Sequence, residues 1–153
     1  MPVAGETESE RIARNWDEIL QELRVTQTGT QILLGFLLTI PFQAGFGDLG
    51  EGRVTVYLCL VVVAAVATVL ALSPVALHRA LFRRGAKLQL VLIGNVLLRL
   101  ALAAIALALS GTVFLIFDVV IDHPAAFVAG GATLALTTAM WVVLPAFLRG
   151  PRE

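Results

Sequence analysis

The sequence predicts an all-α fold, a four-helix transmembrane bundle preceded by an amphipathic, cytoplasmic N-terminal helix. The first observation behind this prediction is composition. Hydrophobic residues make up 58% of the 153 residues, charged residues only 14%, and the mean hydropathy is +0.89, whereas soluble domains carry about 25% charged residues. The second observation is that the apolar residues fall in four long runs. About 20 such residues cross a ~30 Å hydrocarbon core as a helix. This composition excludes a soluble globular enzyme, a disordered chain and a basic nucleic-acid binder.

The N-terminal region divides into a disordered acidic segment, residues 1–8, and an amphipathic juxtamembrane helix, residues 9–24. Apolar residues of this helix recur at three- and four-residue steps and so share one face, namely Ile12, Trp16, Ile19, Leu20 and Leu23. Thr7 and Glu10 have the spacing of a capping box, which favours a helix start near residues 7–9. We expect the helix to bend onto the membrane surface, with Trp16 at headgroup depth.

Four spans follow at residues 25–42, 54–77, 90–121 and 125–148, together the bundle of residues 25–148. Their runs are continuous and rich in Ala and Leu, which favours helices over the short alternating strands of a barrel. Ser73-Pro74 resembles a helix start, so we expect a separate short basic helix over residues 74–84. Small residues recur every fourth position and predict close helix packing, as in Ala64/Thr68, Ala104/Ala108/Thr112, Ala129/Thr133/Thr137 and Gly131/Ala135.

Basic residues outside the spans predict the orientation. Nine of them lie before span one, between spans two and three, and in the tail at residues 149–153, whereas only Arg53 lies in an outer loop. The positive-inside rule then places both termini in the cytoplasm. We expect a multi-pass protein of the cytoplasmic membrane.

A stripe of mostly polar residues runs along span one at three- and four-residue steps. It contains Arg24, Gln27, Gln31, Gly35 and Thr39. Unpaired amides are costly in hydrocarbon, so we expect this amide stripe to face other helices. It has two interpretations, a polar path or binding groove, and simple hydrogen bonding between helices.

Two charges lie at or within span three. If the span begins near Leu90, Arg99 lies about 10–14 Å inside the membrane; otherwise it marks the inner interface and snorkels to the surface. Asp118 is flanked by apolar residues near the outer end of its helix. It is either a proton-exchanging carboxylate or an interfacial acid, with Arg53 as its expected partner. Asp118, Asp122 and His123 make a weak metal pattern that lacks further ligands.

The acidic face of the N-terminal helix is the candidate for cytoplasmic docking. Its residues Asp17, Glu18 and Glu22 would meet Arg79, Arg83 and Arg84 of the central loop. The alternatives are a solvated face without a specific partner and an external partner protein.

Sequence motifs of catalysis do not occur. The sequence has no phosphate-binding glycine loop, nucleophile elbow, HExxH pattern or cysteine pair. We therefore expect no enzyme activity and no bound cofactor.

Three motifs carry a resemblance. They are residues 14–29, RNWDEILQELRVTQTG, residues 31–43, QILLGFLLTIPFQ, and residues 73–79, SPVALHR. These motifs are similar to those of a bacterial family of small four-span membrane proteins of unknown function. Some members of this family carry automatic labels as sodium:proton antiporters. The resemblance implies a fold of four spans and supplies no catalytic or binding residues.

Two function classes remain. The first is an accessory or interaction subunit of the cytoplasmic membrane. The second is a small oligomeric ion or solute transporter, for example for cation:proton antiport, with Arg24, Gln27, Gln31, Arg99 and Asp118 along a polar path. The expected partners are the lipid bilayer and either further copies of the chain or a larger membrane complex, and not nucleic acid.

Overall fold

The computed structural model describes residues 7–81 and 87–148, and their order is α1 (Glu8–Thr39), η1 (Ile40–Phe42), η2 (Phe46–Asp48), α2 (Glu51–Leu81), α3 (Lys87–Val120), α4 (His123–Thr138), η3 (Ala139–Val143) and α5 (Leu144–Leu148). Every regular element in these residues is helical, so the all-α prediction is confirmed. The predicted disordered segment, apart from its last two residues, and the predicted tail lie outside the described residues.

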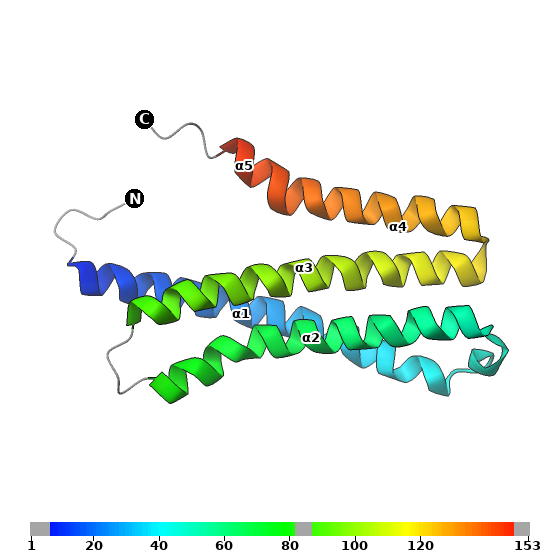
Figure 1. Cartoon of the computed structure of the whole chain (residues 1–153), viewed down its shortest axis with the longest axis horizontal. Helices are drawn as coiled ribbons and strands as arrows, with labels where there is room; N and C mark the ends of the chain where they lie inside the picture. The colour runs from blue at the N-terminus through cyan, green and yellow to red at the C-terminus, as the bar shows by residue number, and fades with distance from the viewer. Residues whose placement is uncertain (1–6, 82–86, 149–153) are drawn as a thin grey trace.

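Four helical segments are long and apolar enough to cross a membrane, namely Arg14–Phe42, Glu51–Leu77, Val91–Val120 and His123–Leu148. They run in alternate directions along the long axis of the molecule (Figure 1). The end where α1 begins and α5 ends is called the N/C end here, and the end that joins α1 to α2 and α3 to α4 is called the turn end. Many large apolar side chains face outward. Lipid covers such a surface, whereas water-soluble monomers rarely expose one this large.

Helix α1 is one unbroken helix, so the predicted bend between the juxtamembrane helix and span one is wrong. No proline or glycine interrupts residues 8–28, and apolar packing favours a straight course. The capping box is confirmed, because the Thr7 side chain accepts from the Glu10 N–H and Glu10 accepts from the Thr7 N–H. Residues 9–24 therefore form the first turns of the first spanning helix.

The apolar face of the N-terminal part of α1 packs on α3. Ile19 and Leu23 are buried in a cluster with Leu98. The ring of Trp16 lies against α3 so closely that a Cβ on Gly94 would be 3.3 Å from it. The periodicity identified the apolar face, and α3 supplies its partner.

Helix α2 runs through Pro74, so the predicted separate helix over residues 74–84 is also wrong as far as residue 81. Proline removes one backbone hydrogen bond. Pro74 is fully buried, and the hydroxyl of the adjacent Ser73 donates to the carbonyl of Val69 at 2.7 Å. Burial of Pro74 in the bundle is consistent with a helix that continues through it.

Small residues set the closest contacts between helices. Leu60 of α2 packs directly on Gly111 of α3, and Ala64 and Ala108 are both buried in the central cluster. A Cβ on Gly130 of α4 would lie 2.9 Å from the Cβ of Phe114. Absent side-chain volume therefore lets α2, α3 and α4 approach closely.

The last span changes its helical pitch before its end. A π-helical segment, η3, separates α4 from α5. Pro145 follows it, and its ring would clash with the carbonyl four residues earlier in a regular α-helix. Neither η3 nor α5 makes close backbone contact with α3 in the described residues. The span thus packs on α3 near the turn end and leaves it toward the N/C end (Figure 1).

Replacement of Gly130 by alanine tests the contact between α3 and α4. The added Cβ would meet the Cβ of Phe114 and, at 3.2 Å, the backbone oxygen of Ser110. We expect Gly130→Ala to lower the free energy of unfolding by about 1–3 kcal/mol. Gly131→Ala is the matched control, because its Cβ meets nothing within 4 Å. Equal unfolding midpoints of the two variants in detergent would contradict this packing.

The start of α1 should depend on pH. The hydroxyl and the N–H of Thr7 donate to the Glu10 carboxylate at 2.7 and 2.8 Å, and they hold the pKa of Glu10 below its ordinary value of 4.5. Because the folded pKa is the lower one, the stabilisation is complete above about pH 4.5 and is lost as the pH falls through the lowered value. We expect hydrogen exchange of the first-turn amides to accelerate there, and Glu10→Gln to remove this pH dependence.

Candidate functional site

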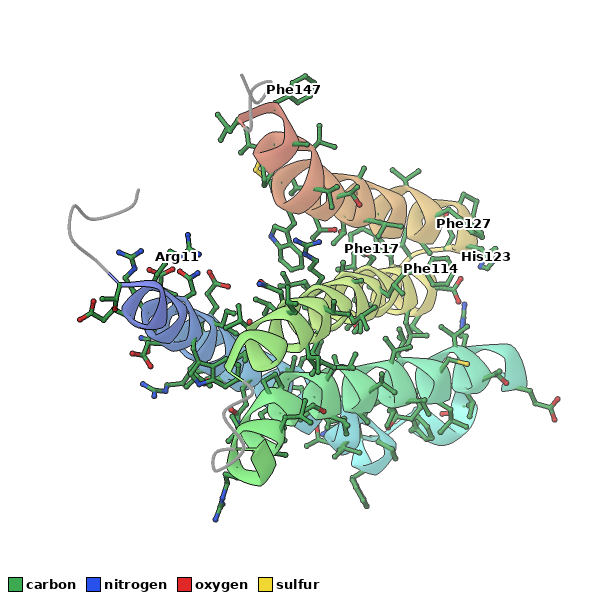
Figure 2. The ribbon with its side chains drawn as sticks, turned by 60° about the vertical axis from the view of Figure 1, so that its left-hand side comes forward. Arg11, Phe114, Phe117, His123, Phe127 and Phe147 are labelled. Carbon is green, nitrogen blue, oxygen red and sulfur yellow. The ribbon has the colours of Figure 1, made fainter. Side chains whose placement is uncertain are left out.

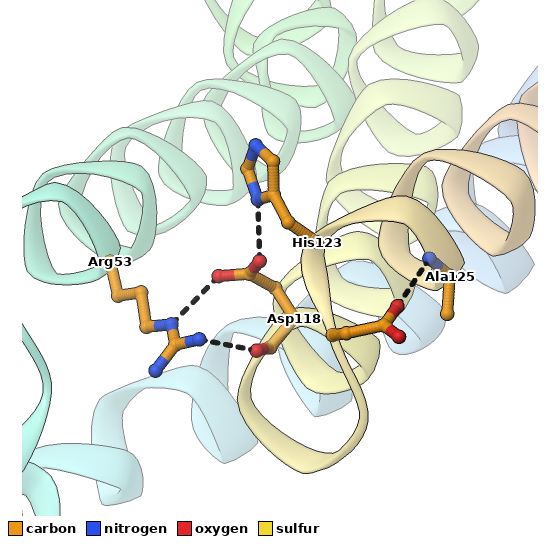
Figure 3. A network of polar contacts seen from close by, with 5 residues as sticks. Arg53, Asp118, His123 and Ala125 are labelled. Carbon is orange, nitrogen blue, oxygen red and sulfur yellow. Dashed lines mark hydrogen bonds and ion pairs between the residues drawn. The ribbon is translucent and has the colours of Figure 1, made fainter.

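A charged cluster joins three helices at the turn end. Arg53 of α2 donates from Nε to the Asp118 carboxylate of α3 at 2.7 Å and from Nη2 to the Asp118 backbone oxygen at 2.6 Å. Nδ1 of His123, at the start of α4, lies 2.6 Å from the other carboxylate oxygen. Both oxygens of Asp118 are therefore engaged, one by each neighbour (Figure 3).

A tight turn places His123 beside Asp118. Helix α3 ends at Val120 and α4 begins at His123, where Asp122 caps the helix by accepting from the Ala125 N–H at 2.8 Å. The imidazole also packs edge-on against Phe114 and Phe127, with ring centroids 5.8 and 5.0 Å away. These three rings gather at the turn end, far from Arg11 and Phe147 at the N/C end (Figure 2). The ring of His123 is held by both packing and hydrogen bonding.

Exposure separates the three members of the cluster. The Asp118 side chain is only 7% exposed, whereas those of Arg53 and His123 are 41% and 66% exposed. An ionised carboxylate only accepts hydrogen bonds, so Nδ1 of His123 carries the proton and donates. Nε2 then remains for water, headgroups or a ligand. The cluster compensates a buried carboxylate and ties the start of α2 to the turn between α3 and α4.

The structure agrees with the second interpretation of Asp118, an interfacial acid that pairs with Arg53. The weak metal pattern is not assembled, because Asp122 is used as a helix cap. Among residues 7–81 and 87–148, no three His, Cys, Asp or Glu side chains are grouped to hold a metal ion.

The amide stripe of α1 lies on the outside of the bundle. Arg24, Gln31, Gly35 and Thr39 are exposed, and Gln27 is half-buried. The prediction that the stripe faces other helices is therefore wrong for the helices of this chain. The buried face of α1 is a different one, and it carries Ile19, Leu23, Thr30 and Leu37 at four- and seven-residue steps.

Arg99 projects from α3 beside the last span. It lines a groove with Leu102, Leu134 and Trp141. Arg99 is exposed, and it forms no ion pair or hydrogen bond with a residue that the structure describes. Neither Asp118 nor Gln31 is among the groove residues, so the candidate path residues are spread over separate surfaces.

The candidate docking residues divide into two groups. Asp17, Glu18 and Glu22 are exposed, and Glu18 lies 3.9 Å from Arg14 on its own helix. Arg79 is exposed on α2 and has no ion pair with them in the described part of the chain. Arg83 and Arg84 lie outside the described residues. Docking of the acidic face on the central loop stays a prediction.

Sequence reasoning missed two polar contacts of the turn end. One is the His123–Asp118 contact, and the short Asp122-His123-Pro124 turn with its capping residue was the signal for it. The other is Tyr57, whose hydroxyl donates to the Leu37 carbonyl at 2.9 Å and links α2 to α1. A single tyrosine in an apolar run gives no sign of its partner.

Separate and joint removal of the ion pair tests the cluster. We expect Arg53→Gln to lower the unfolding midpoint by about 5 °C, more than Asp118→Asn, because it leaves the buried carboxylate with one partner. The double variant should lose less than the sum of the two. Glu51→Gln removes an exposed charge nearby and should leave the midpoint unchanged. Additive losses would show that the pair contributes no coupling.

Comparison with known proteins identifies a family match. Residues 5–145 match a family of unknown function, DUF6328. No curated protein and no solved structure matches the chain. The match covers all four helical segments except for the last residues of the final one. The chain belongs to the DUF6328 family.

Proposed function

We propose that this protein is an accessory or interaction subunit of the cytoplasmic membrane, with both ends of the chain in the cytoplasm, and that its first contact is a second copy of itself along the amide stripe. One observation carries the proposal. The amide of Gln31 is exposed on α1 and takes part in none of the hydrogen bonds of the described residues. The proposal includes no catalysed reaction.

The depth of Gln31 makes this exposure costly in lipid. Gln31 lies eight residues before the end of α1 at Thr39, about 12 Å along the helix and so well inside a ~30 Å core. An amide without a partner in hydrocarbon loses several kcal/mol relative to water. Lipid tails offer neither donors nor acceptors, so the partner must be protein.

A second copy of α1 is chemically suited to this role. A carboxamide carries both a donor and an acceptor, so two Gln31 side chains related by a twofold axis can pair with each other. Gly35, one turn away and exposed, has no side chain to keep the two backbones apart. Arg24, the one charged residue of the stripe, lies toward its N/C end, and its guanidinium donates to Gln21 of the same helix at 3.3 Å.

The alternative, transport, has less support. A path would need Gln31, Arg99 and Asp118 on one continuous surface, but they lie on the outside of α1, in a groove beside α3 and in the cluster at the turn end. Asp118 is also engaged by Arg53 and His123. These positions favour lateral association over a polar route through one protomer.

Removal of the amide tests the proposal. We expect Gln31→Leu to weaken self-association in lipid vesicles about threefold to tenfold, because one or two interhelical hydrogen bonds are lost. Energy transfer between labelled copies, measured across a range of protein-to-lipid ratios, gives the association constant.

The matched control is Gln43→Leu, which removes an exposed amide just after α1 and η1 and should leave the association unchanged. A chain that stays monomeric at every lipid ratio would contradict the proposed contact. Ion flux into vesicles that Asp118→Asn abolishes would favour transport instead.

A further inference from the structure

A groove of about 630 Å³ lies between α3 and the last span. Its walls run from Arg99 to Leu107 on α3 and from Leu134 to Ala146 on α4, η3 and α5. Most of the lining is apolar, and Arg99 is the one charged residue among the described residues that line it. The groove is made by different helices from the amide stripe of α1.

The fold keeps this groove open. Near the turn end, Gly130 lets α4 approach the backbone of α3 at Ser110. Beyond it, the π-helical segment and Pro145 lead the chain away, and η3 and α5 lack close backbone contact with α3 in the described residues. Helix α3 and the last span lie close at the turn end and diverge toward the N/C end (Figure 1), and the groove lies where they diverge.

Arg99 and Trp141 mark the depth of the groove mouth. Arg99 is 19 residues from Asp118 along α3, about 28 Å, and Trp141 is 18 residues from His123, about 27 Å. A hydrocarbon core is about 30 Å thick, so with Asp118 at one surface both residues lie at the other. Arginine and tryptophan are the side chains that suit the headgroup level.

The cation at this level has no partner in residues 7–81 or 87–148. Arg99 is exposed and forms no ion pair or hydrogen bond with the described residues. A guanidinium presents a planar set of donors that match a phosphate in two-point contact. The unpaired charge at the mouth therefore selects an anion, and the apolar walls below it select a hydrocarbon chain.

The depth of the groove fits the acyl chain of a lipid. From Arg99 to Leu107 the groove follows α3 for eight residues, about 12 Å, which is most of one ~15 Å leaflet of hydrocarbon. An acyl chain attached to a phosphate at Arg99 would extend along these apolar walls into the same leaflet.

We propose that this groove is a binding site for an anionic phospholipid. The phosphate pairs with Arg99, one acyl chain lies against the apolar walls of α3 and α4, and Trp141 flanks the headgroup region. The site is independent of the self-association proposed above, and either can fail alone.

Quenching of Trp141 by brominated lipid tests the site. The chain has two tryptophans, so Trp16→Phe leaves Trp141 as the reporter. The full-length protein is reconstituted in phosphatidylcholine vesicles that contain equal mole fractions of brominated phosphatidylglycerol or brominated phosphatidylcholine. We expect stronger quenching by the anionic probe. Arg99→Gln should weaken its apparent affinity about tenfold, whereas Arg79→Gln, which removes an exposed charge on α2, should leave it unchanged.

A second pair of variants keeps Arg99 in place. Ala103→Phe fills the groove and should reduce quenching by the anionic probe, and Ala132→Phe, on an exposed part of α4 outside the groove, should not. Equal quenching by the two probes would overturn the proposal, as would equal effects of Arg99→Gln and Arg79→Gln. Absent quenching together with crosslinking between cysteines placed at residue 103 of two copies would assign the groove to protein instead.

Discussion

A hydrocarbon layer admits ionised side chains at its two surfaces far more readily than at its centre, and this constraint organises the molecule. Helix α3 carries Arg99 and Asp118 about 28 Å apart, close to the thickness of the layer. Asp118 is buried, so it needs the compensation that Arg53 and His123 provide. The same contacts hold the first turn of α2 and the start of α4 against α3. One surface of the layer is thus also where three helices are joined.

Close packing between these surfaces depends on missing side-chain volume. In lipid, helices gain little from hiding apolar surface from one another, so contact area and backbone approach decide which faces meet. Leu60 packs against Gly111, and Phe114 packs against Gly130. The last span has no such contact with α3 beyond its π-helical segment. The groove beside Arg99 is the result of that change in packing along a single span.

Two polar features of the outer surface, the amide stripe of α1 and Arg99, bear on the proposed function. The exposed amide stripe of α1 has no satisfactory environment in a lone protomer, since lipid cannot supply hydrogen bonds. Arg99, at the mouth of the groove, has no anionic partner among the described residues. Both features are lateral, and neither leads through the bundle. They agree better with a protein that recognises neighbours within the membrane than with one that conducts solutes.

The sequence by itself determined the helical class, the four spanning segments and the capping box at Thr7, because each depends on local composition or spacing. It also indicated Arg53 as the partner of Asp118, because the outer loops contain no other arginine or lysine. Tertiary structure decided the rest. Residues 9–24 continue into the first span because α3 covers Trp16, Ile19 and Leu23, and a sequence shows that a face is apolar but not what covers it. Gln31 faces outward because Leu23, Thr30 and Leu37, spaced seven residues apart, occupy the buried face of the same helix. A helical period identifies faces, and only the competition among all helices for contact decides which face is buried.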